Sequence, residues 1–441
     1  MSGIARAPDA AVRAPYFGQR LPAQQWFGLA AVVWLPFTYA LTLDLRFPFK
    51  LSELMLVLAG LAVLAELRLR AAPGALRLVR PLVALVLLSA GVLFFFAANP
   101  LLTVESGTFD ARFGAAGDGL AKLAYLLLAI FGFLVLSYAA YRDAALFARA
   151  WVGGALAGAG YAWLLFVLSV IGAPPLLLPG MSAVQYIALG EHSYIRSGPM
   201  VEGNYFGLFL VCSTAVAVYA RRWPAALVLS ATTVITFSTA NLLGLGILWL
   251  GVAWSATASR RDGRGRLAGQ LTLVAAGVTA LLLLGATGYA AEVLIGKLAT
   301  ADPGSKLDRI DQALAGILMF ADHPLTGVGL GQYGFHYKAY QLTDFFRGGE
   351  SVKPIPNNVY VEVLAETGVA GAALFGLFLV GLLRRARGRE VAPLRWGMLA
   401  MLLVFNAFPS YTPLFIWAFW ALLVAAARRG AGSAPPAPAA S

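Results

Sequence analysis

Three polar side chains stand together where an apolar run begins near residue 203. Arg196, Glu202 and Asn204 fall within the short segment 194–205, immediately before that run. A charge at the edge of a lipid bilayer is costly unless it is paired or used. Two interpretations stay open: Arg196 reaches lipid headgroups or pairs with Glu202, or the cluster acts on a ligand.

A second cationic position lies in a long polar segment, residues 290–357. One helical face collects apolar residues, namely Leu307, Ile310, Leu314, Ile317 and Leu318, and the opposite face collects polar ones, namely Lys306, Asp308, Arg309, Asp311 and Gln312. This period is typical of an amphipathic helix. We expect the helix to lie on the outward surface of the membrane or to cap a cavity.

Three glycines within five residues follow that helix, at Gly327, Gly329 and Gly331. Such spacing demands tight turns or a close backbone approach. No Lys-Ser or Lys-Thr pair follows and no strand precedes, which excludes a P-loop and favours a structural turn. His323, before Pro324, is expected at a helix end. His336 has a side chain suited to a general base, although a hydrogen-bonded or solvated histidine is the alternative.

Composition places these residues in a membrane protein. The chain has 441 residues, of which 60% are hydrophobic and 12% charged, and its apolar runs recur at about the 20 residues that span a bilayer. The net charge of +12 comes from arginines between these runs, so it indicates topology and no nucleic-acid partner. The single cysteine, Cys212, excludes an intrachain disulfide and a cysteine-based metal site.

About twelve spans can be placed, which predicts an all-α polytopic membrane protein with a large helical periplasmic loop. The runs are 26–43, 51–66, 81–98, 119–139, 146–172, 203–220, 224–239, 241–258, 269–289, 359–383, 394–409 and 414–427. The run 224–258 is one long helix or two short ones, and two fit the charges better. Basic residues gather between alternate runs, so both termini are expected in the cytoplasm.

The expected organisation has five parts. Residues 1–25 form a cytoplasmic tail, 26–289 nine spans, 290–357 the periplasmic helical loop, 358–427 three spans, and 428–441 a disordered cytoplasmic tail.

Three motifs, in this order and spacing, carry a family resemblance. They are Arg-Ser-Gly-x-x-x-x-Gly-Asn from Arg196, His-Pro-Leu-x-Gly-Val-Gly-Leu-Gly-x-Tyr from His323, and Asn-Asn-x-Tyr-x-Glu-x-Leu-Ala-Glu-Thr-Gly from Asn357. Together they resemble the bacterial O-antigen ligase and Wzy-type O-antigen polymerase superfamily over roughly residues 190–410.

The resemblance implies a GT-C-like, metal-independent glycosyltransferase of the bacterial inner membrane, with no cofactor and an undecaprenyl-diphosphate-linked glycan as donor at the periplasmic face. Arg196 and Arg309 match the family's two arginine positions, where a guanidinium can bind the diphosphate and stabilise the leaving group. Asn204, Asn357 and Asn358 would support the site. The outer segments contain no Asp-x-Asp motif that would bind a divalent metal.

The sequence departs from the family pattern at two places. Asn357 stands where members usually carry a histidine that could activate an acceptor hydroxyl, so His336 or Glu202 would have to take the catalytic role. Ser238-Thr239-Ala240-Asn241 stands where relatives often have Ser-Arg. If one cation is missing, Lys306, Lys338, Arg347 or Lys353 could supply positive potential.

Polymerisation of lipid-linked repeat units into O-antigen or exopolysaccharide is therefore the leading function. The first alternative is a ligase that passes the finished glycan to lipid A core. An alternative of another class is a polysaccharide or lipid-linked sugar transporter or flippase. The partners expected are the glycan donor, a glycan or lipid A core acceptor, a chain-length regulator and membrane lipids.

Overall fold

The computed structural model describes residues 22–38, 43–44, 48–98, 114–181, 184–189, 192–200, 202–257, 303–343 and 353–431. The span predicted at 269–289 and most of both terminal tails lie outside these residues, as does the start of the predicted 290–357 loop.

Four of the described helices are long and apolar enough to cross a membrane. They are α5 (Gly114–Arg142), α6 (Ala144–Val170), α9 (Thr239–Thr257) and α13 (Val359–Arg385). Shorter apolar helices are α2 (Leu51–Ala65), α4 (Arg80–Ala98), α7 (Gly203–Tyr219), α8 (Trp223–Val234), α14 (Ala392–Val404) and α15 (Leu414–Ala431). The chain is thus a mostly helical membrane protein, and the number twelve stays a prediction.

The first predicted span, 26–43, is wrong, because the short helix α1 (Ala23–Val33) ends before Pro36, which cannot continue a helix. The predicted helical fold is confirmed in outline. Two small antiparallel hairpins add to it: β1 (Leu43–Asp44) pairs with β2 (Pro48–Phe49), and β3 (Tyr186–Leu189) pairs with β4 (His192–Ile195).

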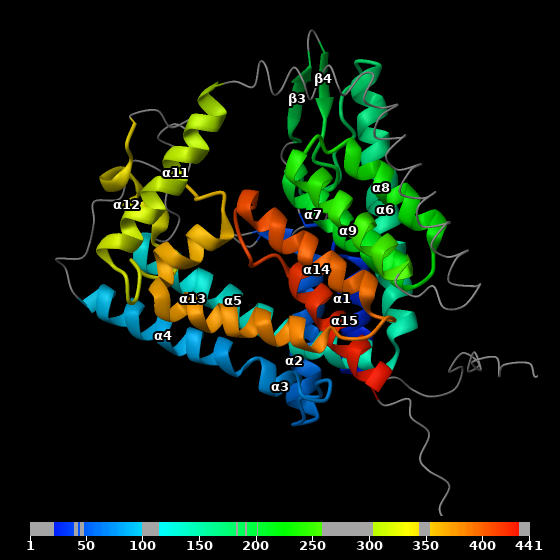
Figure 1. Cartoon of the computed structure of the whole chain (residues 1–441), viewed down its shortest axis with the longest axis horizontal. Coiled ribbons are helices and arrows are strands. Elements are labelled where there is room, and N and C mark those ends of the chain that lie inside the picture. Colours follow the sequence, from blue (N-terminus) through cyan, green and yellow to red (C-terminus); the bar gives the residue numbers. More distant parts are fainter. Residues whose placement is uncertain are drawn as a thin grey trace, which may run out of the picture.

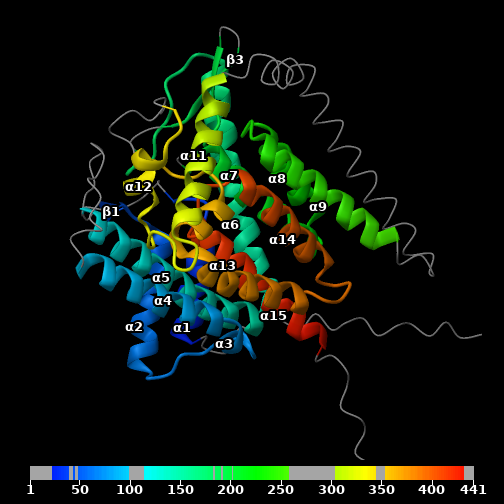
Figure 2. The ribbon, with the colours of Figure 1, turned by 60° about the vertical axis from the view of Figure 1, so that its left-hand side comes forward.

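The helices pack as two groups that are joined through α6, which contacts α5 on one side and α7 and α8 on the other (Figure 1). In one group α4 lies alongside both α5 and α13, and α15 packs on α5. In the other, α7 packs on α8 while α14 contacts α7 and α9 (Figure 2). Fully buried aromatic side chains join α13 to α15, where the Phe378 ring stacks on Trp417 with centroids 5.8 Å apart.

The continuous apolar run 224–258 is two helices in the structure. α8 ends at Val234 and α9 begins at Thr239. Between them Phe237 has a φ of 49°, a left-handed conformation that interrupts helical hydrogen bonding. The break exposes the polar segment 238–241 to the neighbouring helix α7, which matters for the site below.

The long segment 290–357, called the outer segment after its predicted side of the membrane, contributes α11 (Pro303–Asp322) and α12 (Tyr333–Tyr340). The amphipathic helix is confirmed as a helix, and its polar side packs inward: Asp311 and Gln312 are 3% and 2% exposed, while Ile310 and Ile317 are 56% and 49% exposed. Asp311 accepts the Tyr337 hydroxyl hydrogen bond at 2.5 Å and two backbone N–H groups after α12. The apolar face therefore points away from the protein, as expected of a helix resting on lipid.

The glycine-rich segment is a structural turn, as predicted. α13 is kinked at Gly368, which has a φ of 60°. Across the kink, Val328 N–H donates to the Ala365 carbonyl at 2.8 Å, and Val369 N–H donates to Pro324 at 2.8 Å. A Cβ on Gly327 would lie 2.4 Å from the backbone of Glu366, so only glycine permits this approach.

Candidate functional site

The β3–β4 hairpin delivers Arg196 to the start of α7. Arg196 N–H donates to the Gln185 carbonyl at 3.0 Å, and its Nη2 donates to Asn204 Oδ1 at 3.1 Å. A Cβ on Gly203 would lie 2.4 Å from Arg196 Nε. The motif spacing thus has a physical cause, because Gly203 leaves room for the guanidinium and Asn204 orients it.

Arg309 on α11 belongs to the same electrostatic neighbourhood. Burial, and then the charge of Arg309, lower the pKa of Arg196 to about 10. Burial raises the pKa of Glu202 although both arginines oppose that rise. Arg196 Nε is buried and has no hydrogen-bond partner among the described residues. Two guanidinium groups and one carboxyl group whose charges influence one another leave an excess of positive charge, which suits an anion.

Asn241 ends the segment Ser238–Asn241, where relatives often have Ser-Arg. Its Nδ2 donates to the Asn204 carbonyl at 3.0 Å and to Ser238 Oγ at 2.9 Å. The side chain is fully buried against Gly207, where a Cβ would lie 2.2 Å from Nδ2. The amide holds the first turn of α7 and adds no charge to the site.

The two asparagines at the start of α13 hold the backbone in place. Asn357 has a φ of 49°, and its Nδ2 donates to Gln312 Oε1 at 2.7 Å, which joins α11 to the entry of α13. Asn358 is the N-cap of α13, and its Oδ1 accepts the N–H groups of Tyr360 and Val361. Both asparagines therefore stabilise the backbone at the start of α13.

His336 lies on α12 and is 7% exposed. Burial, and then the neighbouring His323, lower its pKa to about 4, so the imidazole is neutral near pH 7. A pKa this far below 7 makes the imidazole a weaker proton acceptor than an ordinary histidine, and its role as a base stays a prediction. His323 itself follows the last residue of α11, as predicted for a helix-end residue.

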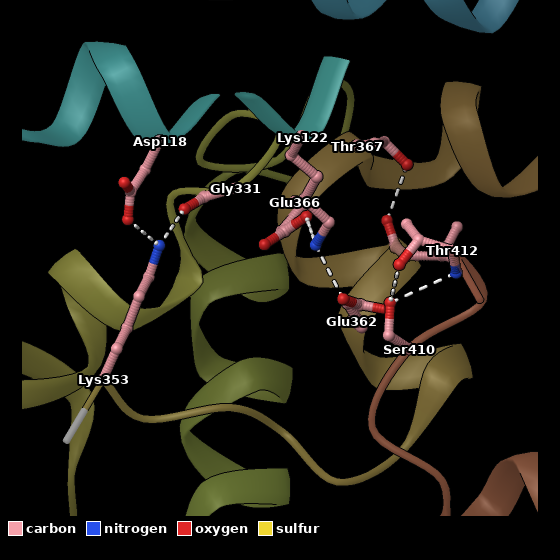
Figure 3. A network of polar contacts seen from close by, with 10 residues as sticks. Asp118, Lys122, Gly331, Lys353, Glu362, Glu366, Thr367, Ser410 and Thr412 are labelled. Atoms are coloured by element: carbon pink, nitrogen blue, oxygen red, sulfur yellow. Dashed lines mark hydrogen bonds and ion pairs between the residues drawn. The ribbon is translucent and has the colours of Figure 1, made fainter. Parts of the chain in front are cut away.

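A cavity of about 460 Å³ lies between α5, the start of α13 and the segment 353–356. On one wall the Lys122 ammonium donates to Glu362 Oε1 at 2.6 Å and to Glu366 Oε2 at 2.5 Å (Figure 3). All three side chains are largely buried, with 17%, 6% and 4% of their surface exposed. Burying such a network is costly and marks a functional position as readily as a structural one.

A second ion pair lies one turn earlier on α5. Lys353 Nζ donates to Asp118 Oδ2 and to the Gly331 carbonyl, both at 2.8 Å (Figure 3). Of the four cations that the sequence offered for the site, Lys353 lines this cavity. Lys338 lies in the last turn of α12, while the side chains of Lys306 and Arg347 are outside the described residues.

Apart from Lys353, the charged residues of this cavity were not predicted as site residues from the sequence. A signal was present, since Lys122 interrupts an apolar run and Glu362 and Glu366 are four residues apart on one helical face. The pairing itself joins residues 240 and 244 positions apart and is visible only in three dimensions. The described part of the chain holds no group of three His, Cys, Asp or Glu side chains placed to bind a metal.

One known protein family matches the outer segment together with its flanking helices. Residues 224–376 match the family model Wzy_C, described as O-antigen ligase. The resemblance to the O-antigen ligase and Wzy superfamily is thereby confirmed over a segment that contains Arg309, His336 and Asn357, while Arg196 precedes it. A search of curated proteins found no match.

Proposed function

Because residues 224–376 match the O-antigen ligase family, we propose that the protein transfers a glycan from a polyprenyl diphosphate carrier at the periplasmic face of the bacterial inner membrane. The family match supports a role in processing O-antigen or other lipid-linked glycans. The distribution of basic residues supports a cytoplasmic position for both termini.

The observation that carries this proposal is the arginine pair. Arg196 precedes α7 and Arg309 lies on α11, and after burial the charge of Arg309 is the next cause that lowers the pKa of Arg196. Breaking a sugar–diphosphate bond adds negative charge to the leaving diphosphate. Fixed guanidinium groups bind that charge bidentately and stabilise it without a metal ion.

The acceptor hydroxyl must lose a proton as it attacks the anomeric carbon. Glu202 lies beside the arginines, and burial raises the pKa of its carboxyl. His336 supplies the neutral imidazole of the outer segment. We propose these two as the candidate bases, with Asn204, Asn357 and Asn358 holding the backbone and Arg196 in position.

The arginine roles are tested by replacing each with glutamine in the producing bacterium. Arg196→Gln and Arg309→Gln should abolish polymeric glycan and leave lipid-linked units accumulated on the outer leaflet. Arg149→Gln is the matched control, because Arg149 is exposed on α6 and has no part in the cluster. Accumulation on the inner leaflet would instead favour a flippase and refute the transferase proposal.

We propose the polymerase in preference to the ligase, because Asn357 replaces the histidine usual in ligases. The test is a gel of lipopolysaccharide and free polysaccharide from a deletion strain. Chains limited to one repeat unit support the polymerase. Long lipid-linked chains with no glycan on the lipid A core would identify the ligase.

A further inference from the structure

The 460 Å³ cavity differs from the arginine site in the sign of its charge. Its ionised side chains are two ammonium groups and three carboxylates, from Lys122, Lys353, Asp118, Glu362 and Glu366. The balance is negative, whereas Arg196, Arg309 and Glu202 give a positive balance. A diphosphate is therefore repelled from the cavity and attracted to the arginines.

One oxygen in the cavity has no donor. Lys122 binds Glu362 through Oε1, whereas Glu362 Oε2 is buried and has no hydrogen-bond partner among the described residues. The residue is 5% exposed and lines the cavity. A buried carboxylate oxygen without a donor is unfavourable, and a hydroxyl entering the cavity would satisfy it.

The remaining walls are flat and amphipathic. Tyr125, Tyr205 and Tyr333 line the cavity together with the prolines Pro354, Pro356 and Pro409. Ring faces of this kind pack against the C–H surface of a neutral ring, while carboxylates and ammonium groups bond to its hydroxyls. The volume lies within the range of small-molecule sites, which begins at about 300 Å³. The chemistry suits one or a few sugar residues.

The first turn of α7 contributes a residue to each site. Asn204 accepts the hydrogen bond of Arg196, and the next residue, Tyr205, lines the cavity. The cavity and the arginine site therefore both border this turn.

We propose that this cavity binds the terminal sugar of the acceptor glycan, and that Glu362 Oε2 accepts a hydrogen bond from one of its hydroxyl groups. The proposal rests on the transferase function proposed above. It assigns the neutral, hydroxyl-rich substrate to the cavity and the anionic carrier to the arginines.

Binding to the purified full-length protein in detergent tests this division. The probes are undecaprenyl diphosphate and the two oligosaccharides that mild acid releases from lipid-linked repeat units and from lipopolysaccharide core. Glu362→Gln should weaken binding of one oligosaccharide by about tenfold or more, since a hydrogen bond to a charged group is lost, and leave undecaprenyl diphosphate unchanged. Asp143→Asn is the matched carboxylate-to-amide control, because Asp143 caps α6 far from the cavity in sequence and asparagine caps equally well.

A second variant protects the test against misfolding. Ala121→Leu fills the cavity from α5 without changing charge, and it should likewise reduce oligosaccharide binding alone. Loss of undecaprenyl diphosphate binding in Glu362→Gln, or undiminished oligosaccharide binding in both variants, would overturn the acceptor site. Failure of the unaltered protein to bind undecaprenyl diphosphate would instead count against the transferase function.

Discussion

Lys122 pairs with two buried carboxylates at once, and replacing it should destabilise the protein more than replacing either of them. Lys122→Gln leaves Glu362 and Glu366, 5% and 4% exposed, facing each other without a cation. Removing one partner of a buried ion pair typically destabilises by about 3–5 kcal/mol. Glu366→Gln leaves the Lys122–Glu362 pair intact and neutral, so its loss should be the smaller by at least about 2 kcal/mol.

The assay is thermal or denaturant unfolding of the detergent-purified protein, followed by intrinsic fluorescence. A third variant, in which Lys122, Glu362 and Glu366 all become glutamine or methionine, should recover much of the stability lost in Lys122→Gln, since no unpaired charge stays buried. Equal losses of stability for Lys122→Gln and Glu366→Gln, or no recovery of stability in the triple variant, would refute this reasoning. Either result would mean that unpaired buried carboxylates do not determine the stability of the network.

Three further predictions concern other parts of the chain. Gly327→Ala should destabilise the protein by about 1–3 kcal/mol, because its φ of 67° and the nearby α13 backbone leave no room for a Cβ. Gly376→Ala is the control in the same melting assay: a Cβ there meets no atom within 4 Å, so the change should be neutral or slightly stabilising. The folded-state pKa of His336, about 4, lies below its unfolded value; stability should therefore fall as pH drops from about 6.5 towards 4, and His336→Gln should flatten that melting curve against pH. Leu342→Cys, 59% exposed, should react with a membrane-impermeant maleimide in intact cells while the buried native Cys212 stays silent, and an unlabelled Leu342→Cys would place this segment on the cytoplasmic side.

Patterns local in the sequence predicted local structure well. The amphipathic period of residues 307–318 predicts α11, and the glycine spacing predicts the turn before α12, because both signals depend on neighbours within one or two helical turns. The first span failed because a proline inside an apolar run ends a helix, and hydropathy alone does not register that stop.

The site was only partly predictable for the same reason. Arg196 and Asn204 could be grouped from the sequence because only eight positions separate the two hydrogen-bonded residues. Lys122 and Glu362 are far apart in the sequence, and their pairing depends on how α5 packs beside the start of α13. The orientation of α11 could not be predicted from the sequence pattern either. Periodicity separates a polar from an apolar face, but the hydrogen bonds of Asp311 with residues in and after α12 decide which face packs on the protein.

The shared backbone hydrogen bonds between the glycine turn and the kink in α13 set a rule for building chimeras. The N–H groups of Val369 and Ala370 donate to carbonyls of Pro324 and Leu325, so the outer segment completes a break in the helix. Grafting the outer segment of a relative up to the start of α13 would separate these partners. An exchange that extends past residue 370 transfers the donors and the acceptors of these hydrogen bonds together. Residues 224–376, the part matched by the family model, include both the glycine turn and the kink in α13.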